Sequence, residues 1–337
     1  MDIAKNSNMK SRNPSIEVMR CLLMFFIVLY HGCNNKPDSV VCANSVVKLI
    51  PWFLFFCTNS FMFISGWFGI RFSWGRVLRF LGMGAFAAVV LGLASKSVLG
   101  SWHWQFSLGW FGTSYLAVML LAPIVNSGLE TLAKDSRRSL LLAWSAFAAA
   151  VFVSWLPLGL KIPGWCGHGF STMLFIYVSA RVIRLAELET RISSRMAALI
   201  FFVALGIHLA RLVPIVLYPS VKDLFILTAD YDAPEVLVMG AAFFLMLYRV
   251  RFPNWLNASC VLLAPSMFVV YLLHEGGSVV GPRFYDQLVL FLFNQMPMGG
   301  ALGCVFAIAL GATTLFFTCC GIDAFRRIAL RMCIREA

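Results

Sequence analysis

The chain has 337 residues, of which 60% are hydrophobic and only 12% are charged, and its mean hydropathy is +0.83. Soluble domains carry about 25% charged residues, so this composition excludes an ordinary soluble protein and predicts a polytopic membrane protein. A net charge of +12 would suggest nucleic-acid binding in a soluble protein. Here the basic residues gather in alternate loops, which indicates membrane topology and argues against a nucleic-acid partner.

Apolar stretches of membrane-spanning length recur along the whole chain and predict an all-α bundle of about ten helices. We therefore treat residues 1–337 as one membrane-embedded domain. Residues 283–297 are apolar but short; they are given no span and could lie at the membrane interface. The predicted spans are residues 15–33, 47–70, 79–95, 107–125, 139–157, 169–184, 196–217, 235–249, 256–274 and 300–320.

The distribution of lysine and arginine predicts the orientation. The N-terminal tail and the loops after the even-numbered spans hold 19 of the 27 Lys and Arg residues, whereas the opposite loops hold six. Arg20 and Arg211 lie inside predicted helices. Because short basic loops remain in the cytoplasm, both tails (residues 1–13 and 321–337) are expected there.

Three ionisable residues share one stripe of the first span. Arg20 and His31 are eleven residues apart, which is about 20° from three full turns and corresponds to a rise of about 16 Å. Glu17 lies three residues before Arg20, close enough to pair with it. Such residues are costly in a membrane and indicate a functional interior, so we expect them to face a tunnel. The alternative is that His31 is only a hydrogen-bonding residue between packed helices.

Arg71, Arg76 and Arg79 follow the second span. Arg76 and Arg79 form an Arg-x-x-Arg pair on one helical face, which suits the oxygens of a phosphate. The alternative is that these residues only mark the cytoplasmic side.

Two further groups lie in the outer halves of later spans. His208 and Arg211 are one turn apart in the span 196–217, and His274 closes the span 256–274 three residues after Tyr271. For His274 a polar cap and a functional role are both open. The sequence contains no Ser/His/Asp triad, Walker loop, metal cluster or nucleotide fingerprint.

The order and spacing of these pieces resemble the acyltransferase-3 family of integral membrane O-acyltransferases. One departure is that Gly112-Thr113-Ser114 stands where many relatives have an acidic residue, so no catalytic acid is assigned there. The resemblance rests on Glu17, Arg20 and His31; Ser65-Gly66-Trp67-Phe68; Arg76-Val77-Leu78-Arg79; Trp110, Tyr115 and Pro123; and Tyr271-Leu272-Leu273-His274.

The resemblance implies transfer of an acyl group, usually acetyl, from cytoplasmic acyl-CoA to a hydroxyl of a cell-envelope or surface glycan. Acyl-CoA would be a co-substrate, with no permanently bound cofactor and no metal. The acceptor would be a glycan or a lipid-linked glycan, and the location a bacterial inner membrane, in contact with membrane lipid. Homo-oligomerisation is left open.

The expected roles follow from side-chain chemistry. His31 would be the general base, because histidine changes its charge near neutral pH. Arg20 would stabilise negative charge or position the pantetheine arm, with Glu17 orienting it. The other predicted groups are Arg71, Arg76 and Arg79 for the CoA phosphates, and His274, Tyr271 and Arg211 for the acceptor.

A proton-coupled transporter is the alternative function, since a Glu/Arg/His stripe also suits a proton relay. Against it, the sequence shows no paired halves and no matching broken helices. A membrane scaffold without activity is a third option, and the costly charges of the first span argue against it.

Overall fold

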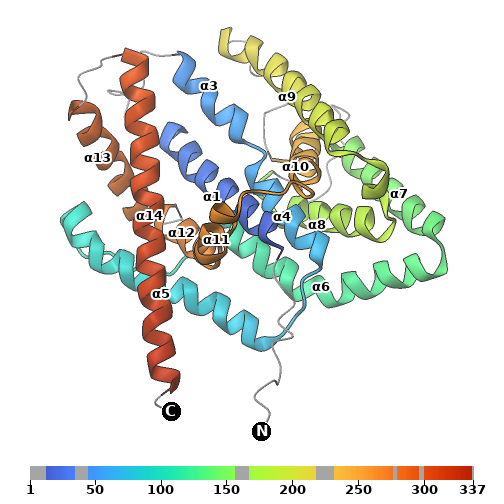
Figure 1. The fold of residues 1–337 in the computed structure, drawn as a ribbon, viewed down its shortest axis with the longest axis horizontal. Helices are drawn as coiled ribbons and strands as arrows, with labels where there is room; N and C mark the ends of the chain where they lie inside the picture. The colour runs from blue at the N-terminus through green and yellow to red at the C-terminus, as the bar shows by residue number, and fades with distance from the viewer. Residues whose placement is uncertain are drawn as a thin grey trace.

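A computed structural model of the chain describes residues 13–34, 45–155, 167–217, 231–275, 279–295 and 300–335. The regular structure in these ranges is entirely helical (Figure 1). The elements are α1 (Pro14–Asn34), α3 (Ser45–Leu54), α4 (Cys57–Phe68), α5 (Trp74–Leu99), α6 (Gly109–Asp135), α7 (Arg137–Trp155), α8 (Phe170–Leu185), η1 (Leu188–Arg191), α9 (Ser194–Leu217), α10 (Pro234–Leu247), α11 (Asn254–Leu263), η3 (Ala264–Ser266), α12 (Met267–His274), α13 (Val280–Gln295) and α14 (Gly300–Arg335).

Seven helical segments of the described chain are long and apolar enough to cross a membrane, which confirms a multi-pass helical membrane protein. Helices α7, α8 and α10 match predicted spans in position but are not among the seven. The seven segments are Pro14–Cys33, Ile50–Phe68, Trp74–Leu99, Gly109–Asp135, Ser194–Arg211, Asn254–His274 and Gly300–Met332.

Helix α1 is the centre of the bundle. It packs against α3, α4, α11, α12, α13 and α14. Figure 1 shows α13 and α14 on one side of it and α7, α8 and α9 on the other. Of its apolar window 61% is buried, against 17% for α6. Helix α1 is therefore much more enclosed by its neighbours than α6 is.

Two predicted spans are broken in the middle. The predicted helix 47–70 is divided into α3 and α4 at Phe55 and Phe56, four residues after Pro51. The predicted helix 256–274 is divided into α11 and α12 by a 3-10 turn that contains Pro265. Proline lacks the backbone N–H that a continuous helix needs, which accounts for the break at Pro265. Pro51 lies inside α3, which continues past it to Leu54.

Several boundaries differ from the predictions. Residues 283–297, which were given no span, belong largely to helix α13. Helix α5 begins at Trp74 because the Ser73 hydroxyl caps it by accepting from the N–H of Arg76 (3.4 Å). Helix α14 continues far beyond residue 320, where buried Asp323 pairs with Arg326 (2.7 Å) and Arg327 (3.1 Å) on the next turn.

The segment between α5 and α6 runs back along α5. The ring of Trp104 lies on Gly92, and the side chains of Phe106 and Leu108 lie on Gly84. A Cβ atom at Gly92 would come within 2.1 Å of the Trp104 ring, so the glycine makes this approach possible. Since Gly84 is fifteen residues before the end of α5, helix α6 begins about 22 Å along α5 from that end.

Candidate active site

The predicted pair of charges in the first span is present. Arg20 Nη1 lies 3.1 Å from Glu17 Oε1, three residues earlier on α1. Glu17 is buried, whereas 35% of the Arg20 side chain is exposed. The carboxylate therefore holds the guanidinium at the edge of an open space.

That space is a cavity of about 290 Å³ which brings four of the five predicted site arginines together. Arg20 lines it with Arg71, Arg76 and Arg79, although these residues come from α1, from the connector after α4 and from α5. No carboxylate is among the described residues that line it. Four guanidinium groups around one cavity suit a ligand with several phosphate groups.

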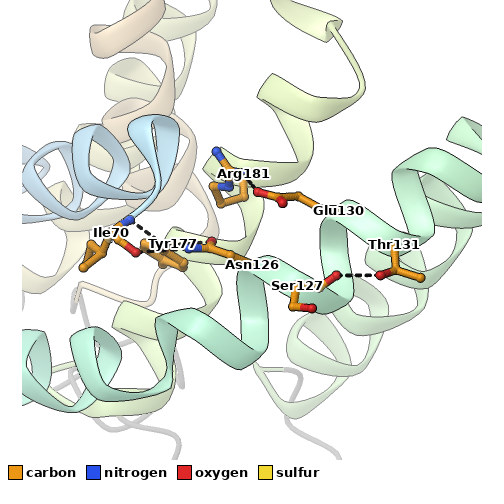
Figure 2. A network of polar contacts seen from close by, with 7 residues as sticks. All are labelled: Ile70, Asn126, Ser127, Glu130, Thr131, Tyr177 and Arg181. Atoms are coloured by element: carbon orange, nitrogen blue, oxygen red, sulfur yellow. Dashed lines mark hydrogen bonds and ion pairs between the residues drawn. The ribbon is translucent and has the colours of Figure 1, made fainter. Parts of the chain in front are cut away.

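The connector that carries Arg71 is held by a hydrogen-bond network that sequence reasoning missed (Figure 2). The Tyr177 hydroxyl on α8 accepts from the Ile70 N–H (2.9 Å) and donates to Asn126 Oδ1 on α6 (2.9 Å). The side-chain amide of Asn126 donates in turn to the Ile70 carbonyl (3.1 Å). Both backbone groups of Ile70 are thus satisfied, which fixes the path of the chain into the arginine cavity.

Close helix packing supports the same connector. A Cβ atom at Gly66 would lie 2.4 Å from the Tyr177 carbonyl oxygen, so this glycine lets α4 approach α8. Gly69, which follows α4, has a left-handed backbone (φ +71°) beside the guanidinium of Arg181. Arg181 is held by Glu130 of α6 at 2.8 Å. The Ser-Gly-Trp-Phe segment therefore sets the geometry of the cavity as well as lining it.

At the other end of α1, the structure joins two of the predicted histidines. His31 Nδ1 lies 3.0 Å from His274 Nε2, and His274 Nδ1 lies 2.8 Å from the Val270 carbonyl oxygen. His274 is fully buried, whereas His31 is only partly buried.

These contacts fix the protons of the neutral histidine pair. A carbonyl oxygen only accepts, so His274 Nδ1 must carry a hydrogen and His274 Nε2 a lone pair. His31 Nδ1 must then carry the hydrogen between the two rings. His31 Nε2 is left with its lone pair, which is the arrangement of a general base.

Packed aromatic rings lie between the cavity and the histidines. Phe80 and Tyr115 line the cavity, and Phe80 stacks on Phe268 with ring centroids 4.1 Å apart. Phe268 is next to Tyr271 (6.1 Å), which is next to His274 (6.1 Å). The cavity covers only the Arg20 end of the expected tunnel and does not reach His31.

Arg211 lies in a different cluster from His274 and Tyr271. It pairs with Glu235 (2.7 Å), which also lies 3.1 Å from Nδ1 of the fully buried His208. This cluster borders an apolar cavity of about 600 Å³ between α7, α9 and α10. The structure thus brings together eight of the nine predicted site residues as two neighbouring groups, and it places Arg211 elsewhere.

Comparison with protein-family models, with curated proteins and with solved structures finds no match for this chain. The functional interpretation therefore rests on the geometry of the site and on the sequence motifs.

Proposed function

We propose that this protein is a membrane O-acyltransferase that moves an acetyl group from cytoplasmic acetyl-CoA to a hydroxyl of a cell-envelope glycan. The observation that carries the proposal is the arrangement along α1. An arginine-lined cavity lies at Arg20, and a histidine with a basic nitrogen lies on the same helix at His31.

The proposed orientation follows the positive loops. About ten spans with both tails in the cytoplasm would place the arginine cavity on the cytoplasmic side and His31 on the outer side. A bacterial inner membrane suits this arrangement, because acetyl-CoA is made in the cytoplasm and envelope glycans lie on the other side. The acceptor would reach His31 from outside or on a lipid carrier.

The donor would bind with its phosphates at Arg71, Arg76 and Arg79. Arg20 completes the cavity, and its pairing with Glu17 holds it in place. The long pantetheine arm of CoA would run from there toward His31, a rise of about 16 Å along α1. For this to happen the stacked rings of Phe80 and Phe268 must separate.

The chemistry at His31 is acyl transfer to oxygen. The acceptor hydroxyl oxygen attacks the thioester carbonyl carbon while His31 Nε2 takes the hydroxyl proton. The carbon–sulfur bond then breaks, and the leaving thiolate takes that proton from His31. The products are an acetyl ester and free CoA, and His31 returns to its starting form.

Purified protein with radiolabelled acetyl-CoA and envelope glycan tests the proposal. His31→Ala should abolish transfer of label to the glycan without loss of folded protein. His103→Ala is the matched control, because His103 is an exposed histidine that contacts Ser101 in the loop after α5. Transfer by His31→Ala at the normal rate would refute the base assignment.

The same preparation in vesicles distinguishes the alternative, a proton-coupled transporter. Uptake of a solute driven by a proton gradient, with no labelled glycan from acetyl-CoA, would replace the acyltransferase proposal by the transporter. Labelled glycan formed in detergent, where no gradient exists, would exclude transport as the source of the activity.

A further inference from the structure

We propose that the first turn of α6 and the hydroxyl of Tyr271 form the oxyanion site of this protein, the place where the thioester oxygen gains negative charge. This inference rests on the proposed acyltransferase function and assigns a specific part of its mechanism. It concerns two hydrogen-bond donors: the backbone N–H group of Phe111 and the Tyr271 hydroxyl.

Helix α6 begins inside the bundle. Its N-cap, Leu108, lies on Gly84 in the middle of α5, and the preceding segment fills the space along α5. The start of a 27-residue helix, with its partial positive charge, is thereby placed in the interior.

The N-cap residue of α6 provides no side-chain cap. The first four N–H groups of any helix, here those from Leu108 to Phe111, lack a partner within the helix, and Leu108 provides no side-chain acceptor for them. The hydroxyl of Ser107 accepts only from the N–H of Gly109 (3.1 Å). Helix α5 shows the contrast, because there the Ser73 hydroxyl occupies this position.

Tyr271 supplies the second, independent observation. Its side chain is 5% exposed, and its hydroxyl has no hydrogen-bond partner among the residues that the structure describes. Tyr271 lies beside the first turn of α6, with its ring centroid 5.8 Å from that of Phe111 and its hydroxyl near the Phe111 backbone N–H. A buried hydroxyl without a partner is costly, and here it lies beside a backbone donor that also lacks a partner within its helix.

The site lies beside the proposed base. Tyr271 and His274 are three residues apart on α12 and therefore project from one face, with ring centroids 6.1 Å apart. His274 contacts His31 at 3.0 Å. A thioester placed between α6 and α12 would have its oxygen near the donors and its carbonyl carbon open to the hydroxyl that His31 deprotonates.

The acceptor oxygen forms a bond to the carbonyl carbon, the carbonyl π electrons move to the carbonyl oxygen, and His31 Nε2 takes the proton. The Tyr271 hydroxyl and the Phe111 amide donate hydrogen bonds to that negatively charged oxygen. When the carbon–sulfur bond breaks, the electron pair returns to form the ester carbonyl, and the proton passes from His31 to the CoA sulfur.

The test compares Tyr271→Phe with Tyr285→Phe. In each variant one buried hydroxyl is removed and the ring is kept. Tyr285 is the matched control, because its hydroxyl donates to the Ile308 carbonyl (3.5 Å), away from α6. We expect Tyr271→Phe to lower kcat about 100- to 1,000-fold with an unchanged KM for acetyl-CoA, the effect typical of losing one oxyanion donor.

The control variant, and not Tyr271→Phe, should have the lower melting temperature. Tyr271→Phe should keep or raise the wild-type melting temperature, since it removes a hydroxyl without a partner, whereas Tyr285→Phe should lower it and keep kcat. Such a result cannot come from loss of structure at Tyr271. A Tyr271→Phe variant with wild-type kcat, or one whose only defect is a higher KM for acetyl-CoA, would overturn the oxyanion assignment.

Failure of the proposed function would be seen separately. Wild-type protein that transfers no label from acetyl-CoA to any hydroxyl acceptor refutes the acyltransferase proposal, and the oxyanion assignment with it. Active wild-type protein together with active Tyr271→Phe refutes only the oxyanion assignment.

Discussion

His31 and His274 are 243 positions apart in the chain, yet their ring nitrogens lie 3.0 Å from each other in the bundle. The contact joins α1 to the end of α12, and the Val270 carbonyl continues it (2.8 Å). It determines which nitrogen of His31 is free to accept a proton. Four predictions concern this pair, the arginine cavity, its supporting network and the packing of α4.

Replacing His274 tests its role as a positioning residue. In His274→Ala the His31 ring loses the partner that keeps hydrogen on Nδ1, so we expect kcat to fall about 10- to 100-fold, as for other partners that orient a reactive histidine. The pH dependence of kcat should change as well, because the proton affinity of His31 depends on that contact. A uniform loss of activity at every pH would indicate a packing role alone.

The arginine cavity predicts donor affinity. Arg79→Ala should weaken acetyl-CoA binding about 10-fold, which corresponds to about 1.4 kcal/mol, because one charged contact to a phosphate is lost. Arg79 is a cleaner test than Arg76, whose side chain also donates to the Arg71 carbonyl. Titration calorimetry in detergent measures the affinity. Arg195→Ala, an exposed arginine that is not among the residues lining this cavity, should bind acetyl-CoA normally.

The network around Ile70 predicts a stability effect. Asn126→Ala removes the donor to the Ile70 carbonyl and the acceptor of the Tyr177 hydroxyl, so the free energy of unfolding should fall by about 1–3 kcal/mol. Acetyl-CoA affinity should fall too, because Arg71 is the next residue. Thermal melting with and without acetyl-CoA checks both effects. Thr131→Val, which removes an exposed hydroxyl from the same helix, should leave both values unchanged.

Two glycine-to-alanine substitutions should change the stability of the protein in opposite directions. Gly66→Ala places a methyl group 2.4 Å from the Tyr177 backbone oxygen, so α4 and α8 must separate, and we expect a loss of about 1–3 kcal/mol in stability. Gly82→Ala meets no described atom within 4 Å and should stabilise α5 by up to about 1 kcal/mol. Melting temperatures of the two variants in detergent measure these effects. Equal shifts from the wild-type value would contradict the packing argument.

Local periodicity predicted the features that lie within one helix. The Glu17–Arg20 pair follows from a spacing of three residues, and the positions of most helices follow from the length of the apolar runs. The same reasoning missed the length of α14, because its charged end lies beyond the apolar run that defined the predicted span, and ion pairs of Asp323 with Arg326 and Arg327 link successive turns there. It also missed Tyr177 and Asn126, whose partner is a backbone group on another segment.

The sequence by itself determined that this is a helical membrane protein with an acidic, a basic and an imidazole group on one stripe of its first helix. Hydropathy and a period of 3.6 residues act within a single segment, so one sequence is enough to read them. Only the tertiary structure decided that four arginines share a cavity, that His31 meets His274, and that aromatic rings lie between the two sites. Those contacts depend on how side chains of distant helices fit together, and no local spacing specifies that fit.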